Sequence, residues 1–308
     1  MKKSIVFMLG ISFILMAPIV KAQSLPEFEL SKEWLSQIEK MAPSKPRIAV
    51  NGKKNILIFS LYTGFKHWTI PHTEAVIKLL AEQSGAFTVT VSNDIQAFEK
   101  KELKKFDAII LNNNCSIGDR RDLFWDKLQE DTTLDDQGRL KKAQQLEKNL
   151  INYVRKGGGL MALHGGIVMQ NKSERYGEML GGSFDYHPKQ QKIQVKLVDP
   201  DHPLVAAFEH QGFEHTDEPY IFNNAYFDYD FRPLLYMEAN SLEGLKEKVN
   251  DNIKYISWIK KHGKGRVFYA SPSHNAQSME NPRLLQYFLD ALQYVTGDLK
   301  CDDSPLGR

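Results

Sequence analysis

Short apolar runs alternate with helical segments through the first half of the chain, and this alternation restricts the fold more than any other feature. A helix with one apolar face is predicted over residues 71–82. Strand-like runs occupy residues 55–60, 87–92, 106–112 and 160–163. Strands separated by helices favour a mostly parallel sheet that is covered by helices on both faces. We therefore expect an α/β fold.

The second half of the chain adds further strands and a closing helix. Strands are predicted at residues 191–198, 234–238, 255–258 and 266–270, and a helix at 281–294. Between the two halves, residues 120–155 form a long charged stretch, helical for much of its length and broken near Asp135–Gly138. No low-complexity linker divides the chain, so a single α/β domain is expected over residues 51–300, with a short tail at 301–308.

The first residues have the pattern of a secretory signal peptide. Lys2 and Lys3 precede an apolar stretch at residues 5–20, and Val20-Lys21-Ala22 offers small residues at the cleavage positions. The stretch is short for a membrane-spanning helix, although an uncleaved anchor is the alternative. We expect residues 1–22 to be removed and the protein to be exported, either to the periplasm or to the medium. Residues 23–50 then form an amphipathic lead-in helix.

Charge and cysteine content narrow the classes of partner. The chain has 40 basic and 38 acidic residues, and removal of the three lysines in residues 1–22 leaves a net charge of −1. This balance gives no electrostatic case for binding nucleic acid and favours a small ligand. No second long apolar run follows, so no integral membrane segment is expected after cleavage. Cys115 and Cys301 are interpreted as unpaired thiols, with a disulfide between them as the alternative.

Polar residues follow several of the predicted strands. In open parallel sheets, ligands bind outside the carboxyl ends of the strands. The candidates there are His67 after the first strand, Asn112 and Asn113 after the third, His164 in GGGLMALHGG, and His274 after RVFYA. A predicted loop at residues 213–220, FEHTDEPY, adds His215, Asp217 and Glu218, and His187 precedes a proline in FDYHP.

These residue types fit acid/base or metal chemistry. His164 and His274 are assigned as acid and base, and Glu218 orients one of them. His67, Asn112, Asn113, His187, His215 and Asp217 are assigned to substrate binding, and Phe65, Trp68 or Tyr62 could stack on a sugar ring. A divalent metal such as zinc, held by some of His67, His164, His215 and His274, is a second option. The bland alternative for His164 is a histidine packed under the sheet edge and bonded to a carbonyl.

Six motifs together resemble the ThuA-like (trehalose utilisation) family of the class I glutamine amidotransferase-like superfamily. They are GFKH, GGGLMALHGG, MLGGSFDYHP, DHPL, DEPY and HGKGRVFYASPSH, and the resemblance covers residues 55–296. It implies a flavodoxin-like three-layer sandwich with its site at the strand ends. His164 resembles the position of the superfamily's nucleophilic cysteine, His274 its catalytic histidine, and Glu218 the acidic partner. Imidazole cannot form the glutamyl thioester, so amidotransferase chemistry is not expected.

Two functions remain open at this point. The first is an enzyme that acts on a sugar or an oxidised (keto) sugar by histidine-based or metal-assisted chemistry. The second is a non-catalytic carbohydrate-binding protein on the same scaffold. The long charged segment at residues 120–148 and the expected export both depart from a simple ThuA-like chain. A metal, or histidines that face one another, would favour the enzyme.

The mature chain is predicted to begin near Gln23. The basic start, the apolar core and the Val-Lys-Ala ending together specify this cleavage position. Intact-mass spectrometry of the exported protein checks it. Recovery of a full-length chain embedded in the membrane would show that the segment is an anchor.

Overall fold

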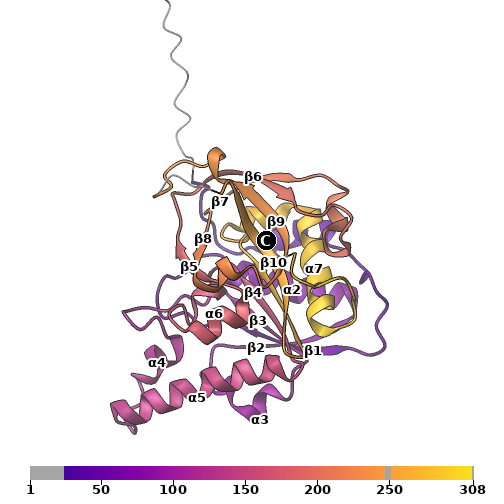
Figure 1. Ribbon diagram of the computed structural model, residues 1–308. Helices are drawn as coiled ribbons and strands as arrows, with labels where there is room; N and C mark the ends of the chain where they lie inside the picture. Colours follow the sequence, from indigo (N-terminus) through magenta and orange to yellow (C-terminus); the bar gives the residue numbers. More distant parts are fainter. Residues whose placement is uncertain (1–23, 247–250, 307–308) are drawn as a thin grey trace, which may run out of the picture.

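A nine-stranded sheet organises the computed structural model, which describes residues 24–246 and 251–306 (Figure 1). The strand order is β2-β1-β3-β4-β11-β10-β9-β6-β7. The strands are β1 (Lys54–Phe59), β2 (Phe87–Ser92), β3 (Ala108–Asn112), β4 (Gly159–Leu163), β6 (Gln191–Leu197), β7 (Phe213–Asp217), β9 (Arg232–Glu238), β10 (Ile253–His262) and β11 (Gly265–Ala270). A separate antiparallel pair consists of β5 (Ser183–Tyr186) and β8 (Ile221–Asn223).

The first five strands of that order are parallel. Their order, β2-β1-β3-β4-β11, is the flavodoxin-like arrangement. From β11 onward the neighbouring strands pair antiparallel, so within the described chain β10 and β6 run against the common direction. The expected α/β fold with a mostly parallel central sheet and a flavodoxin-like architecture is confirmed.

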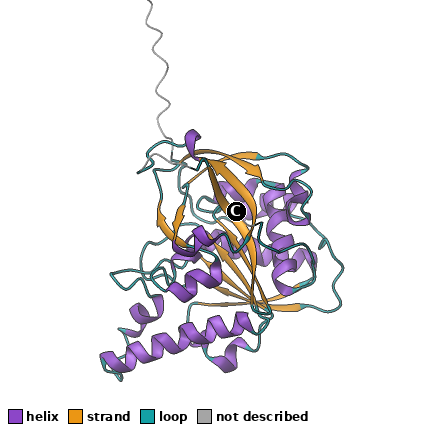
Figure 2. Cartoon of the chain, in the orientation of Figure 1, coloured by secondary structure: helices purple, strands orange, loops and turns teal. Residues whose placement is uncertain are grey.

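Helices cover both faces of the sheet (Figure 2). They are α1 (Lys32–Met41), α2 (Ile70–Ser84), α3 (Lys100–Leu103), α4 (Leu123–Leu128), α5 (Asp136–Arg155), α6 (Glu174–Leu180) and α7 (Pro282–Thr296). One apolar cluster joins α1, α2 and α7 to one sheet face, and a second joins α3, α4, α5 and α6 to the other. The lead-in segment contributes α1, whose Trp34 and Ile38 are buried in the first cluster.

Strand β1 contributes apolar side chains to both faces of the sheet. Successive side chains of a strand point to opposite faces. Ile56 and Ile58 accordingly belong to the cluster with α2 and α7, and Leu57 and Phe59 to the cluster with α5. All four are fully buried. The continuous apolar run is therefore explained by two covered faces rather than one.

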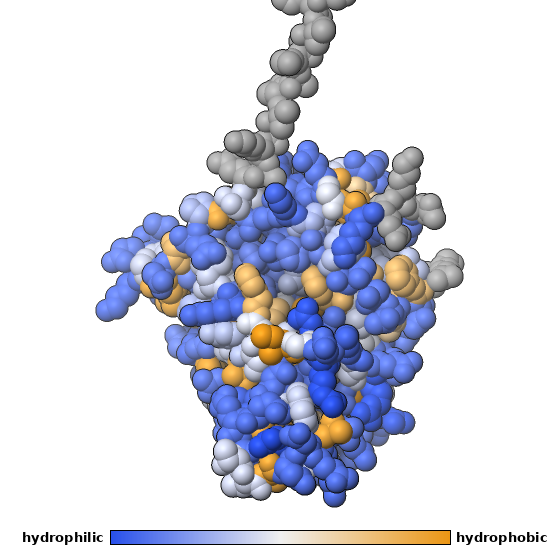
Figure 3. All heavy atoms as spheres, turned by 90° about the vertical axis from the view of Figure 1, so that its left-hand side faces the viewer, coloured by the Kyte–Doolittle hydropathy of each residue, from blue (hydrophilic) through white to orange (hydrophobic). Residues whose placement is uncertain are grey.

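The outer surface has a different composition from these two clusters. The face drawn in Figure 3 is mostly hydrophilic, with apolar side chains scattered in small groups. No helix among the described residues is long and apolar enough to cross a membrane. The predicted signal peptide lies outside the described residues.

Three of the expected element boundaries differ from the structure. The lead-in is helical only over α1, Lys32–Met41, and not over the rest of residues 24–50. The break in the charged stretch lies before Asp135, because the Asp135 side chain caps α5 by accepting a hydrogen bond from the Gly138 N–H at 2.7 Å. The predicted loop at residues 213–220 begins with strand β7, which pairs antiparallel with β6 and buries Phe213. The division into a domain at 51–300 and a tail at 301–308 stays a prediction.

The buried sheet gives a stability prediction with a matched control. Ile58 on β1 is fully buried, whereas its register partner Val91 on β2 is 37% exposed. Ile58→Ala should lower the free energy of unfolding by about 2–5 kcal/mol, because it removes buried methyl groups and leaves a cavity. Val91→Ala should lower it by less than about 1 kcal/mol. Urea unfolding followed by circular dichroism measures both, and equal losses would contradict the two-faced core.

Candidate functional site

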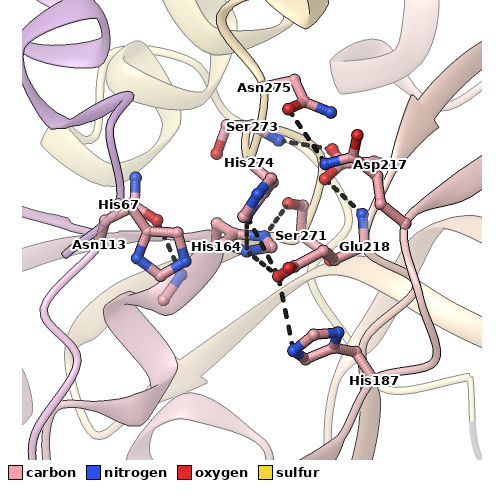
Figure 4. Close-up of polar contacts among 12 residues, drawn as sticks. His67, Asn113, His164, His187, Asp217, Glu218, Ser271, Ser273, His274 and Asn275 are labelled. Atoms are coloured by element: carbon pink, nitrogen blue, oxygen red, sulfur yellow. Dashed lines mark hydrogen bonds and ion pairs between the residues drawn. The ribbon is translucent and has the colours of Figure 1, made fainter. Parts of the chain in front are cut away.

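Three histidines and a glutamate converge at the carboxyl edge of the parallel strands (Figure 4). His67 follows β1, His164 follows β4, His274 follows β11, and Glu218 follows β7. One candidate ligand atom from each residue can be chosen such that all four lie within 4.8 Å of one another. The strands before the three histidines, β1, β4 and β11, lie close together in the sheet, whereas Glu218 follows β7, the strand at the far edge of the sheet.

His164 is held in one orientation by its surroundings. It begins the short 3₁₀ helix η2 (His164–Val168) with φ at 43°, a conformation that non-glycine residues seldom adopt. Its Nδ1–H donates to the carbonyl oxygen of Ser271 at 2.8 Å, since a carbonyl only accepts. The neutral ring therefore presents the lone pair of Nε2 to the cluster. Nδ1 of His164 is thus bonded to a carbonyl, as the structural interpretation expects, whereas Nε2 faces His274 and Glu218.

Three atoms form a nearly equilateral triangle. His164 Nε2 lies 3.2 Å from His274 Nδ1 and 3.4 Å from Glu218 Oε2. His274 Nδ1 lies 3.1 Å from Glu218 Oε2. A proton on His274 Nδ1 alone would leave the lone pairs of His164 Nε2 and Glu218 Oε2 facing each other, so a second proton, on His164 Nε2, or a cation is needed between them. The triangle therefore suits a shared cation.

His67 supplies a fourth nitrogen. Its ring centroid is 5.0 Å from that of His164 and 5.2 Å from that of His274. Its Nδ1 lies 3.8 Å from the Cys115 sulfur, and its buried Nε2 has no hydrogen-bond partner among the described residues. Burial and the nearby His164 and His274 hold the pKa of His67 well below its usual value, so its ring is neutral.

The cluster also shifts the pKa values of Glu218 and His274 in opposite directions. Burial alone would raise the pKa of Glu218, but its hydrogen bonds with His164 and His274 outweigh burial and hold that pKa well below the usual range. Burial alone would lower the pKa of His274, but Glu218 and Asp217 outweigh it and raise the pKa. Without a cation, a proton on His274 therefore pairs with the Glu218 carboxylate.

Asp217 lies behind the cluster and links its loops. Its Oδ2 accepts a hydrogen bond from the Ser273 N–H at 3.1 Å, one residue before His274. Its Oδ1 accepts from the Glu218 N–H at 2.8 Å. His215 lies on the far side of Asp217, with Nδ1 3.6 Å from Oδ2 and 3.2 Å from the Ser278 hydroxyl. His215 is not among the four clustered residues, so of the four histidines considered for a metal only His67, His164 and His274 lie together.

A cavity of about 220 Å³ opens beside the cluster. Its walls are Phe65, His67, Cys115, Arg121, Val168, Phe184, His187, Glu218 and Tyr220. The ring of His187 stacks on Tyr220, and its Nε2 lies 3.7 Å from Glu218 Oε2. A larger cavity of about 520 Å³ lies at the opposite edge of the sheet, between α3 and α5, and its walls carry lysines and amides but none of the clustered residues.

The two asparagines occupy interior positions rather than the cavity wall. Asn112 donates to the Ser60 hydroxyl and to the Ile70 carbonyl. Asn113, with φ at 55°, accepts from the Gly165 N–H at 3.1 Å. Both are fully buried, because they satisfy backbone groups where the loops after β1 and β4 meet. Their assignment to substrate binding finds no support in this geometry.

Several cavity residues were not assigned to the site from the sequence. Cys115, Arg121, Phe184 and Tyr220 line the cavity, whereas the expected stacking residue Trp68 packs instead against Phe28 and His72. The sequence signals for Tyr220 and Phe184 were their places in DEPY and MLGGSFDYHP. Cys115 and Arg121 gave no pattern beyond their place after β3. Both cysteines are free. The catalytic and substrate-binding roles assigned from the sequence stay predictions.

Comparisons with known proteins agree with this architecture. The family model ThuA, described as trehalose utilisation, matches residues 55–295. The fold is similar to that of a ThuA-like protein from Bacteroides uniformis, with a TM-score of 0.59 and 18% identity over 80% of this chain and 94% of that one. It is similarly close to a ThuA-like protein from Parabacteroides merdae, with a TM-score of 0.59 and 13% identity over 80% and 91% of the chains. No curated protein matches the sequence.

Proposed function

This chain belongs to the ThuA family, and we propose that it is an exported enzyme which binds a divalent metal ion such as zinc and acts on a sugar or an oxidised sugar. His164, His274 and Glu218 are the proposed ligands, with His67 beside them. The triangle of their three ligand atoms is the observation that carries this proposal. The choice of a sugar substrate and the export rest on other observations, namely the cavity and residues 1–22.

The size of the triangle is the first argument for a metal. Two ligand atoms at about 2.0–2.1 Å from a tetrahedral zinc ion lie about 3.3–3.4 Å apart. The three distances here are 3.1, 3.2 and 3.4 Å. Two imidazoles and one carboxylate are also a common catalytic ligand set for zinc, which leaves a fourth position for water or substrate.

The hydrogen bonds around the triangle are the second argument. Histidine ligands usually donate their other ring N–H to a carbonyl or a carboxylate, which fixes the tautomer. His164 does so to the Ser271 carbonyl at 2.8 Å. Glu218 is fixed through its backbone N–H by Asp217, which also holds the loop before His274. The ligand atoms are therefore oriented before any ion arrives.

The chemistry follows from what such a site can do. A metal bound here would polarise a substrate carbonyl or activate a water molecule. His67 and His187 line the cavity, and their imidazole rings can donate hydrogen bonds to substrate hydroxyls or accept them. If no metal binds, the His274–Glu218 pair at 3.1 Å still supports acid/base catalysis, which is the second candidate mechanism.

The sugar assignment is supported by the family description and by the cavity. Tyr220, Phe184 and Phe65 provide aromatic walls, and the polar lining residues include His67, His187 and Glu218. Histidines that face one another favour an enzyme over a carbohydrate-binding protein. Burial raises the pKa of Cys115 to about 12, so this thiol is a poor nucleophile, which argues further against amidotransferase chemistry. The export part of the proposal depends on residues 1–22 alone.

Metal binding can be measured directly. The mature protein, loaded with zinc and dialysed, should carry about one zinc ion per chain by inductively coupled plasma mass spectrometry. His164→Ala and Glu218→Gln should each weaken zinc binding by at least about tenfold, because each removes a ligand. His210→Ala is the matched control, since His210 is exposed and lies outside the cluster, with Asp201 as its ion-pair partner. If the wild-type protein retains no zinc after dialysis, the metal proposal is wrong and the acid/base mechanism takes its place.

Turnover should depend on His164 by either mechanism. A thermal-shift screen of sugars and oxidised sugars first identifies a substrate. His164→Ala should then lower kcat by about 10²–10⁴, because it removes either a metal ligand or a general acid/base. The fold should persist, since Leu160, Met161 and Leu163 hold β4 in the sheet. Full activity with unchanged metal content would remove both roles, and a large loss of melting temperature would support a structural one.

A further inference from the structure

The cavity has a permanent positive charge in its wall. Arg121 lies in the segment between β3 and α4, with a half-buried side chain. Its Nη1 donates to the Ser116 carbonyl at 2.8 Å, and Ser116 is itself fixed by a hydrogen bond to the Val168 carbonyl. One arm of the guanidinium is thus anchored. Arg121 itself is one of the residues that line the cavity.

Arg121 makes no ion pair with any carboxylate of the described residues. The nearby acids are committed elsewhere: Asp122 caps α4 through the Trp125 N–H, and Asp126 accepts from Thr63 and Ile117. Glu218, which shares the cavity, is held by histidines. The neighbouring Arg120 is different, because its guanidinium lies over the Trp125 ring at 4.5 Å and does not line the cavity.

The backbone at Arg121 is also unusual. Its φ is 46°, in the left-handed region that favours glycine. Two other non-glycine residues at this edge, Asn113 and His164, share such a conformation. Unusual backbone conformations collect at ligand sites because the surrounding structure fixes them there. This one directs a half-buried arginine into the wall of the proposed active site.

We infer that Arg121 is a specificity residue which binds a carboxylate on the sugar, so that the preferred substrate is a sugar acid. This inference rests on the proposed function and specifies its substrate class. A planar guanidinium fork matches a carboxylate with two parallel hydrogen bonds. A cavity of about 220 Å³ accommodates one sugar residue rather than a polymer. Arg121 is the one arginine or lysine in the cavity wall, and the same wall holds the negative charge of Glu218. A singly charged carboxylate therefore suits this cavity better than a phosphate dianion, which would bring a second negative charge.

Calorimetric titration of the mature protein tests this inference with matched pairs. Glucuronate, galacturonate and gluconate are compared with glucose, galactose and glucitol, and glucose 6-phosphate is included. At least one acid should bind about tenfold or more tightly than its neutral counterpart and more tightly than the phosphate. Arg121→Gln should abolish that preference, and Arg121→Lys should restore only part of it, since lysine keeps the charge but lacks the fork. Arg120→Gln should keep the wild-type preference.

The results separate this inference from the proposed metal site. Zinc content should be unchanged in Arg121→Gln, because Arg121 is not a ligand, and its melting temperature shows whether it folds. Equal affinity for every acid and its neutral partner in the wild-type protein overturns the inference, as does a preference that survives in folded Arg121→Gln. Tighter binding of the phosphate overturns the choice of carboxylate. If the wild-type protein binds no zinc, the proposed metal site is overturned, but the preference for a carboxylate can still be measured.

Discussion

Burial of both faces of the parallel strands is the constraint on which the rest of the structure depends. Side chains on β1, β3, β4 and β11 meet helices on either side, so these strands have no room for exposed polar groups. Polar chemistry is therefore confined to the strand ends. At the carboxyl edge, four consecutive strands in the sheet deliver their following residues into a small volume. The cluster of His67, His164 and His274 is a consequence of this topology as much as of the side chains themselves.

Close packing at that edge then fixes the geometry. A Cβ atom on Gly165 would lie 2.8 Å from the Cys115 sulfur and 2.9 Å from the His67 ring, so the bend after β4 must be glycine for these loops to approach. Asn113 ties this bend to β3 through the Gly165 N–H, and the Ser271 carbonyl ties His164 to the loop after β11. Each tie uses a backbone group that would otherwise be buried without a partner. Loop closure and orientation of the histidines are thus achieved by the same hydrogen bonds.

These features explain how far the sequence could lead. The apolar runs and the helix at α2 were readable because their periodicity reflects burial on two faces, and the rule for parallel sheets correctly collected His67, His164 and His274 at one edge. The rule could not say which way a side chain after a strand turns. Asn112 and Asn113 turn inward to serve the backbone, and His215 falls behind Asp217 because residues 213–217 form a strand. Arg121 was hidden in a charged stretch, since its place depends on a left-handed turn that no local pattern encodes.

The resemblance to the glutamine amidotransferase-like superfamily predicts that His164 stands where a nucleophilic cysteine would, and the geometry around this position bears on that prediction. A cysteine is present in the site, but Cys115 is buried and its pKa is raised to about 12, with Arg121 too weak an influence to offset burial. A thiol in that state neither attacks a carbonyl nor holds a cation well. At the end of β4, by contrast, an imidazole lone pair is fixed 3.4 Å from a carboxylate oxygen. Two acceptors at that separation repel unless a proton or a metal ion lies between them. The position after β4 therefore suits the stabilisation of positive charge in this chain, and a substrate bound there, as proposed, would bring its electron-rich oxygen toward that charge.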